Sequence, residues 1–368
     1  MHAPSRKLLA VLLGLVALGF VVYHAGDMFH LGDFSGARLI HAVRGARLSY
    51  LLLSIIAIYG CYALRALRWR EFQKHVGEAH FWNIYQMTLA GFAAVFLLGR
   101  AGEPVRPLLL ARKGKLPVAD TFGIYVLERL FDTASTAVIA AIGLLVFTAH
   151  AHNGEAASTL ETAAKTGGSL LAAGVLGAAV LLVYVRLHGS AMLERRLKGW
   201  LAAHGWRSGA AKIILGFIRG VQTIRTMRDL AAAVIYSALH WALVLSMYFL
   251  VTQSFGGKLE QLSLGDVMLV LAFTLVGSVV QLPAVGGGSQ ALAIFAFTKV
   301  FGVESEPAVA AAMVIWLISF AFCSIAGVPI LIREGFSLGQ LKELAEQEKK
   351  VLEKEAAAGP GTATRPGE

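Results

Sequence analysis

GRAGEPVRPLLLARKGKLPVADTFGIYVLERLFD, residues 99–132, places six basic and four acidic side chains inside an otherwise apolar chain. The charges that interrupt or open apolar runs form two groups, one at Arg100, Glu103 and Arg106 and the other at Glu128, Arg129 and Asp132. Ionisable groups at membrane depth are costly, so they usually face a bundle interior or a water-filled cavity. We therefore expect the functional site in this stretch.

The composition is that of a polytopic membrane protein. Of 368 residues, 57% are hydrophobic and 15% are charged, and the mean hydropathy is +0.65, outside the range of soluble domains. The apolar runs are about twenty residues long, which favours helices over the alternating segments of about ten residues in a barrel. The sequence therefore predicts an all-α fold, a polytopic membrane helix bundle.

The net charge of +10 does not indicate a nucleic-acid partner. The basic residues cluster between apolar runs, as they do in cytoplasmic loops, so we expect no nucleic acid to bind. The two cysteines, Cys61 and Cys323, lie inside apolar runs. Buried cysteines of this kind usually serve as packing residues.

The expected organisation is a transmembrane domain over residues 1–333 and a charged cytoplasmic helix with a disordered tail over residues 334–368. Amphipathic segments at 24–47 and 186–228 are typical of helices that lie on the membrane surface. Complete spans are expected near residues 8–23, 48–67, 121–148, 170–185, 231–251 and 308–332.

Two further apolar segments, 82–98 and 267–282, are interrupted by glycine and proline. If both turn back as re-entrant hairpins, six helices cross and both termini are cytoplasmic. Lys and Arg then number 26 inside and 5 outside, in agreement with the positive-inside rule. The alternative is that both segments cross completely with kinks, against the charge bias.

Paired broken segments of opposite orientation point to a transporter-like binding site. Pro104 suits a first helical turn that Glu103 can cap. In LPAVGGGSQA, three glycines precede a second short helix, whose free amides make a ready anion site. Arg100 and Arg106 would suit a phosphate there. The alternative is a simple tight turn with arginines that reach the surface.

Glu128 and Asp132 share one helix face at spacing i,i+4. They are candidates for a general acid and base, but pairing with Arg100, Arg106 and Arg129 to hold the hairpin is the favoured interpretation. His240 lies mid-span, where a hydrogen-bonded core histidine is favoured over a proton relay. His150 and His152 lack further ligands at metal-site spacing. Nucleotide-binding motifs are also absent, so we expect neither metal nor cofactor.

GRAGEPVR, VLERLFD and LPAVGGGSQ together resemble motifs of the flippase-like integral membrane family that includes the transmembrane region of lysylphosphatidylglycerol synthases. The resemblance covers nearly all of residues 8–332. It implies a multipass protein of the bacterial inner membrane that handles lipids or lipid-linked intermediates. Many family members have Gly and Glu where this chain has Ser289 and Gln290. The family's polar motif positions fall on Gly102, Glu103, Arg106, Glu128, Arg129, Asp132, Pro283, Gly286 and Gly287.

We therefore expect a lipid flippase that moves a phospholipid or a phosphate-bearing lipid-linked intermediate. The full set of expected substrate-binding residues adds Arg100, Gly288, Ser289 and Gln290 to those motif positions. Only 36 residues follow Ile332, fewer than an aminoacyl-transfer domain needs, so we expect no enzyme activity. A membrane-embedded lipid-modifying enzyme and a non-catalytic partner of a cytoplasmic synthase are the alternatives, and a homo-oligomer is left open.

Overall fold

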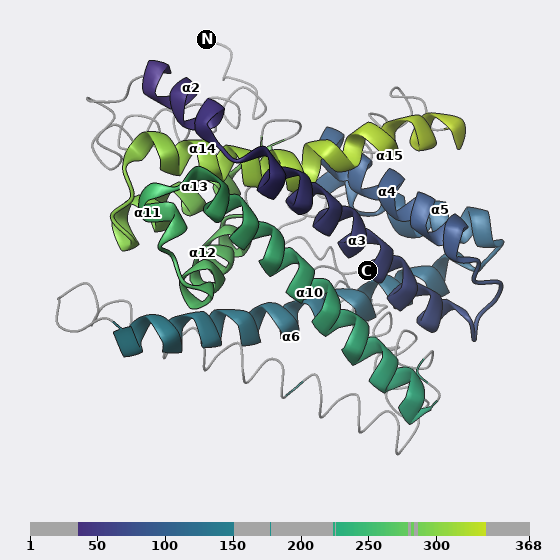
Figure 1. Cartoon of the computed structure of the whole chain (residues 1–368). Coiled ribbons are helices and arrows are strands. Elements are labelled where there is room, and N and C mark those ends of the chain that lie inside the picture. The colour runs from purple at the N-terminus through teal and green to yellow at the C-terminus, as the bar shows by residue number, and fades with distance from the viewer. Residues whose placement is uncertain are drawn as a thin grey trace, which may run out of the picture.

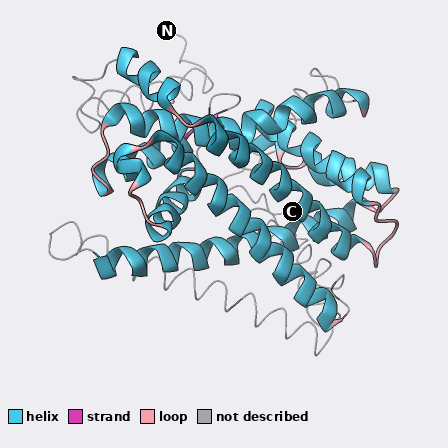
Figure 2. Ribbon diagram, in the orientation of Figure 1, coloured by secondary structure: helices cyan, strands magenta, loops and turns pink. Residues whose placement is uncertain are grey.

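The computed structural model describes residues 36–150, 177, 224, 226–278, 281–282 and 286–335. The described chain is almost entirely helical (Figures 1 and 2). The predicted spans near 8–23 and 170–185 and the charged helix at 338–354 lie outside these residues, apart from Gly177. The N-terminal part contains α2 (Gly36–Gly45), α3 (Leu48–Gln73), α4 (Phe81–Leu98), η2 (Gly99–Gly102), α5 (Val105–Gly114) and α6 (Val118–His150).

The C-terminal part is also helical, with one very short strand pair. Two segments of π-helix, η3 and η4, continue α13 and join α14 to α15. The elements are α10 (Met227–Phe255), α11 (Gly257–Glu260), α12 (Leu264–Gly277), β1 (Gln281–Leu282), β2 (Gly286–Gly287), α13 (Gly288–Phe295), η3 (Ala296–Val300), α14 (Ser305–Trp316), η4 (Leu317–Ala321) and α15 (Phe322–Arg333).

Four helical segments within the described residues are long and apolar enough to cross a membrane. They are α3, α4, α10 and the continuous helix over Ser305–Arg333. This confirms the all-α membrane fold that the composition predicts. α4 is among these segments, although its sequence was predicted to turn back within the membrane. The number of complete spans therefore stays a prediction.

Capping residues set the start of α10 and α12. The Thr226 and Ser263 side chains accept a hydrogen bond from the backbone N–H three residues on. In return, the Asp229 and Asp266 carboxylates accept a hydrogen bond from the backbone N–H of the cap residue. Such reciprocal capping satisfies two otherwise free donors at each helix start. Asp229 also bonds to Lys74 at the end of α3, with 2.8 Å between Oδ1 and Nζ. This contact raises the pKa of the Lys74 ammonium, because it favours the charged form.

The first predicted hairpin is present. α5 packs back along α4, and a Cβ on Gly102 would lie 2.3 Å from the backbone oxygen of Ala94. Only glycine permits this close approach. At the far end of α5, the Leu116 side chain packs against Gly77, just before α4 begins. The chain therefore enters and leaves this hairpin at the same end of the bundle.

The second hairpin is formed by α12 and α13, joined through the β1–β2 pair. A Cβ on Gly277 would lie 2.1 Å from the backbone oxygen of Gly288, so the two arms are in direct backbone contact. Past α13, the Gly302 carbonyl accepts a 2.8 Å hydrogen bond from Lys258 Nζ, which precedes α12. This hairpin also begins and ends at one end of the bundle.

The two hairpins come from opposite ends. In Figure 1, α5 lies at the right of the bundle and α11 to α13 lie at the left. The tip of the first hairpin, η2, lies beside β1 in the tip of the second. The sequence predicted a pair of opposed hairpins, and in the structure their tips lie side by side. That both hairpins turn back within a membrane stays a prediction.

The remaining helices surround these hairpins. α3 packs along α10, α15 packs along α4, and α6 contacts α12 and α10 along the lower side of the view in Figure 1. Residues of α3, α5, α6 and α10 thus face a common interior. Arg65, Arg68, Arg106 and Glu128 are buried there among apolar side chains.

Candidate functional site: a buried charge cluster

The candidate site is a cluster of six charged residues, hereafter the charge cluster, built by three helices. α3 contributes Arg65 and Arg68, α5 contributes Arg106, and α6 contributes Glu128, Arg129 and Asp132. Glu128 is 1% exposed, and Arg68 is completely buried. Charges so deeply buried must be paired or hydrogen-bonded to persist.

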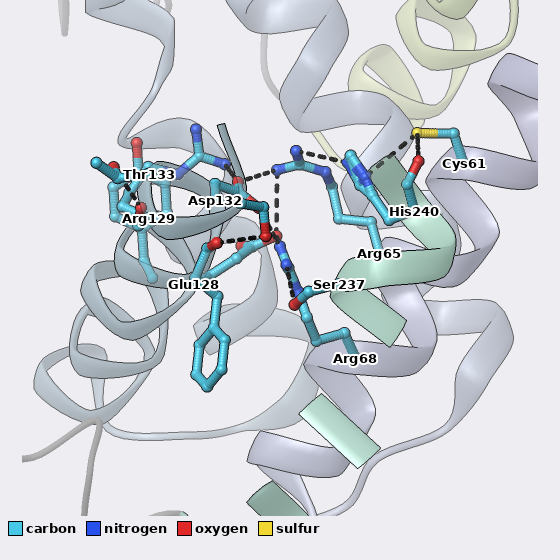
Figure 3. Close-up of polar contacts among 12 residues, drawn as sticks. Cys61, Arg65, Arg68, Glu128, Arg129, Asp132, Thr133, Ser237 and His240 are labelled. Carbon is cyan, nitrogen blue, oxygen red and sulfur yellow. Dashed lines mark hydrogen bonds and ion pairs between the residues drawn. The ribbon is translucent and has the colours of Figure 1, made fainter. Parts of the chain in front are cut away.

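The two carboxylates are shared among all four arginines, and Figure 3 shows three of them, Arg65, Arg68 and Arg129. Glu128 Oε1 lies 3.2 Å from Arg65 Nη1 and 2.9 Å from Arg68 Nη2, and Glu128 Oε2 pairs with Arg106. Asp132 Oδ1 lies 2.7 Å from Arg68 Nη2. Asp132 Oδ2 lies 3.1 Å from Arg65 Nη1 and 3.0 Å from Arg129 Nη2. Each carboxylate oxygen therefore has at least one arginine partner.

Four arginines against two carboxylates leave the charge cluster with a formal surplus of two positive charges. The buried Nε–H groups of Arg68, Arg106 and Arg129 have no hydrogen-bond acceptor among the described residues, and Asp132 Oδ2 is the one carboxylate oxygen of the charge cluster without a hydrogen bond there. Both observations describe a site with more donor and cation capacity than its own carboxylates satisfy.

Arg106 is held by aromatic rings as well as by Glu128. Its guanidinium carbon lies 4.8 Å from the ring centroid of Trp69 and 5.7 Å from that of Phe92. Arginine stacks on aromatic faces because its planar cation is attracted to the ring electrons. Arg106 is only 3% exposed, so it joins α5 to α6 inside the protein.

On α10, His240 and Ser237 complete the inner side of the charge cluster. Arg68 Nη1 donates to Ser237 Oγ at 2.8 Å, and Arg65 Nη2 lies 3.0 Å from His240 Nε2. Because a guanidinium only donates, Nε2 must accept, and the His240 proton therefore sits on Nδ1, 3.5 Å from Cys61 Sγ. Figure 3 shows Arg65 between Asp132 and His240. This is the hydrogen-bonded core histidine favoured from the sequence.

The outer side of the charge cluster is Arg129, whose side chain is 40% exposed. Its guanidinium carbon lies 5.3 Å from the Tyr125 ring centroid. The Tyr125 hydroxyl donates to Glu103 Oε2 at 2.6 Å, which links this side to the tip of the first hairpin. Glu103 was expected to cap the following helix, but this prediction is wrong. Pro104 occupies the cap position of α5 without a side-chain hydrogen bond, since the Glu103 carboxylate is turned toward α6.

In the second hairpin, the glycine turn is stabilised by its own helix. The Gly287 backbone N–H donates to Gln290 Oε1 at 2.5 Å, and the Ser289 hydroxyl lies 3.3 Å from the same oxygen. Gly287 has φ 128°, in the region that favours glycine. Gln290 Oε1 thus accepts a hydrogen bond from one of the backbone amides that the sequence predicted would bind an anion. Pro283 lies outside the described residues, and Gly286 is described only as a residue of β2, paired with Leu282.

The structure brings together only part of the predicted site. Arg106, Glu128, Arg129 and Asp132 meet in the charge cluster, and Glu103 borders it. Among the described residues, Arg106 pairs with Glu128 and not with the turn at Gly286, Gly287 and Gly288. The side chain of Arg100 lies outside the described residues. Whether any of these side chains binds substrate stays a prediction.

Arg65, Arg68 and Ser237 were not predicted as site residues. Arg65 and Arg68 lie at the end of the span expected over residues 48–67, and their i,i+3 spacing puts them on one helix face. Glu128 and Asp132 likewise share one face of their helix, with the opposite charge. These complementary pairs were the sequence signal that could have predicted the contact between the two helices. Among the described residues, no three His, Cys, Asp or Glu side chains are grouped closely enough to hold a metal ion.

Helices of spanning length, two opposed hairpins and buried ion pairs define a multi-pass α-helical membrane protein. The family model of the lysylphosphatidylglycerol synthase transmembrane region matches residues 7–327. The chain belongs to this family, and it is a membrane protein of a lipid-related class. Searches of curated proteins and of solved structures found no match.

Proposed function

We propose that this protein moves a lipid with a phosphate-bearing headgroup between the leaflets of the bacterial inner membrane, with both termini in the cytoplasm. The observation that carries the proposal is the meeting of the two hairpin tips, η2 and β1, in a protein whose first hairpin also supplies Arg106 to a cluster of buried arginines. Broken helices that meet from opposite faces are the arrangement of transporter binding sites.

The surplus positive charge gives the headgroup its partner. An anionic phosphate reduces the electrostatic cost of holding four arginines around two carboxylates, and arginine offers paired donors that suit phosphate oxygens. The headgroup would enter from Arg129, which is the most exposed member of the charge cluster. The acyl chains would stay in the surrounding hydrocarbon.

The arrangement supports transport more than chemistry. A catalytic acid and base need a free carboxyl group near the substrate, yet Glu128 and Asp132 are both held by arginines. The family membership supports a lipid substrate. A partner role beside a cytoplasmic synthase has no contact in the described residues that argues for it.

Reconstitution into liposomes tests the proposal. The purified full chain is added to vesicles that contain a fluorescent phospholipid, and a membrane-impermeant quencher measures how much of it lies in the outer leaflet. Transport predicts faster quenching of the inner-leaflet pool, with the lipid chemically unchanged by mass spectrometry. Altered lipid would favour the enzyme. Neither movement nor alteration would favour the partner role.

Two variants control the assay. Arg129→Gln removes the exposed cation of the charge cluster and should slow lipid movement at least tenfold. Arg228→Gln removes an exposed arginine at the start of α10, outside the charge cluster, and should move lipid as the wild type does. Equal rates in both variants would contradict entry at Arg129.

A further inference from the structure

The charge balance of the charge cluster also indicates which kind of phosphate it selects. Its four arginines exceed its two carboxylates by two charges. Three buried donors, the Nε–H groups of Arg68, Arg106 and Arg129, have no acceptor among the described residues, whereas one acceptor of the charge cluster, Asp132 Oδ2, has ion pairs but no hydrogen bond. These two observations are independent, and each calls for a ligand that brings negative charge and acceptor oxygens.

Phosphate monoesters and diesters differ in both respects. A monoester carries a charge of about −1.5 to −2 at pH 7 and three strong acceptor oxygens. A diester, the form found within ordinary phospholipid headgroups, carries one negative charge and leaves two unesterified oxygens. The surplus of two positive charges therefore matches the monoester more closely than the diester.

We infer that the charge cluster selects lipids that end in a phosphate monoester over lipids whose phosphate is a diester. This inference rests on the proposed function, since it takes the charge cluster as the headgroup site. It narrows the substrate class to lipid monophosphates, in which no further group is attached to the phosphate.

Glu103 borders the charge cluster but is not counted in its charge balance. Its carboxylate accepts from the Tyr125 hydroxyl, and among the described side chains it forms no ion pair with an arginine of the charge cluster. The charge balance is set by the residues that form ion pairs with one another, and among the described residues Glu103 is not one of them. Glu103 lies on the Arg129 side of the charge cluster and puts a negative charge at the entrance. The phosphate is therefore attracted by the inner arginines, Arg65, Arg68 and Arg106.

Access favours a small terminal headgroup. The side chains of Arg65, Arg68 and Arg106 are 8%, 0% and 4% exposed, whereas the Arg129 side chain is 40% exposed. A ligand must therefore pass Arg129 and its stacked partner Tyr125 to reach the inner arginines. A bare phosphate is smaller than a phosphate that carries glycerol or a larger group.

The test is a binding measurement on the purified full chain in detergent. Dioctanoyl phosphatidic acid supplies the monoester and dioctanoyl phosphatidylglycerol supplies the diester on identical acyl chains. Affinities are compared by thermal shift and by native mass spectrometry at pH 7.5. We expect the monoester to bind at least tenfold more tightly. Equal affinity, or tighter binding of the diester, would overturn the inference.

A pH series supplies a second readout on the unmodified protein. The second pKa of a phosphate monoester is about 6, so its charge falls toward −1 below that pH. The preference over the diester should shrink between pH 7.5 and pH 5. A preference that does not change over this interval would show that shape alone, and not charge, is recognised, and would count against the inference.

Variants locate the preference. Arg129→Gln should reduce the monoester preference to less than threefold, whereas Arg129→Lys retains the charge and should keep most of it. Arg228→Gln, outside the charge cluster, is the matched control and should keep all of it. A full preference in a folded Arg129→Gln protein would overturn the proposed entry to the site.

Inorganic phosphate separates two sources of the same chemistry. If it competes with dioctanoyl phosphatidic acid, the phosphoryl group alone is recognised, and if it does not, the acyl chains are also needed. Both results agree with monoester selection. The outcome is independent of transport, because movement of phosphatidylglycerol without any monoester preference would keep the proposed function and remove this inference. Tight monoester binding without lipid movement would keep this inference and remove the proposed function.

Discussion

Arg106 on α5 and Glu128 on α6 form an ion pair that ties the returning arm of the first hairpin to a long helix of the bundle. Glu128 also binds Arg65 and Arg68 of α3 through its other oxygen. One carboxylate therefore holds three arginines from two helices. Loss of its charge should affect the packing of α3, α5 and α6 together.

Glu128→Gln should destabilise the protein more than any other single change in the charge cluster. The glutamine keeps the shape of the side chain but leaves three buried arginines with only Asp132 as a counter-charge, at a cost of about 3 kcal/mol. Thermal unfolding in detergent measures this loss. Glu334→Gln, which removes a surface partner of Lys113, is the control and should cost less than about 1 kcal/mol. A stable but inactive Glu128→Gln protein would indicate that the carboxylate acts directly, as proton carrier or catalyst.

Arg106→Lys should weaken lipid binding while the protein still folds. Lysine keeps the positive charge but lacks the planar fork that pairs with oxygens and stacks on Trp69 and Phe92. We expect a stability loss of about 1 kcal/mol from the weaker cation–ring contact. Vesicle binding and lipid movement are measured beside Arg333→Lys, whose partner Gln86 lies outside the charge cluster. Normal binding and movement would remove Arg106 from the headgroup site.

Gly277→Ala should open the second hairpin. A methyl group there would lie 2.1 Å from the backbone oxygen of Gly288, and neither backbone can move without separating α12 from α13. Overpacking of this kind costs on the order of 1–3 kcal/mol. The matched control is Gly45→Ala, where a Cβ meets no atom within 4 Å. Equal melting temperatures for both variants would contradict the tight packing of the two arms.

His240→Gln should preserve both stability and lipid movement, since an amide oxygen can replace Nε2 as the acceptor for Arg65. His240→Leu removes the acceptor and leaves a buried donor of Arg65 unpaired, at a cost of about 1–3 kcal/mol. Melting temperature and lipid movement are measured for both variants. If the glutamine protein is stable but no longer moves lipid, the proton-relay hypothesis for His240 would gain the support that the geometry does not give it.

The opposed hairpins predict a distinct labelling pattern for introduced cysteines. Glu78→Cys and Lys115→Cys flank the first hairpin, and Gln261→Cys and Glu304→Cys flank the second. All four positions are exposed. An impermeant thiol reagent added to intact cells should label the second pair and spare the first. The native Cys61 and Cys323 are buried and should stay unlabelled. Labelling of only one residue within a pair would show that the segment between them crosses completely.

The sequence by itself determined the class of this protein and the existence of the two hairpins. Apolar runs of spanning length require helices in a bilayer, because every backbone polar group must be satisfied within its own segment. Glycine and proline at 99–107 and 283–288 interrupt those runs. Such breaks are local properties, and local properties can be read from a linear pattern.

Only the tertiary structure decided the partners of the charges. Arg65 and Glu128 are 63 positions apart in the chain, and the spacing along one helix cannot show which residues of another helix it faces. Thus the sequence placed Arg106 beside a glycine turn, whereas packing placed it beside Glu128 and Trp69. The surplus of arginine over carboxylate likewise exists only once α3 lies against α6, because it is a property of the assembled interior and not of any one segment.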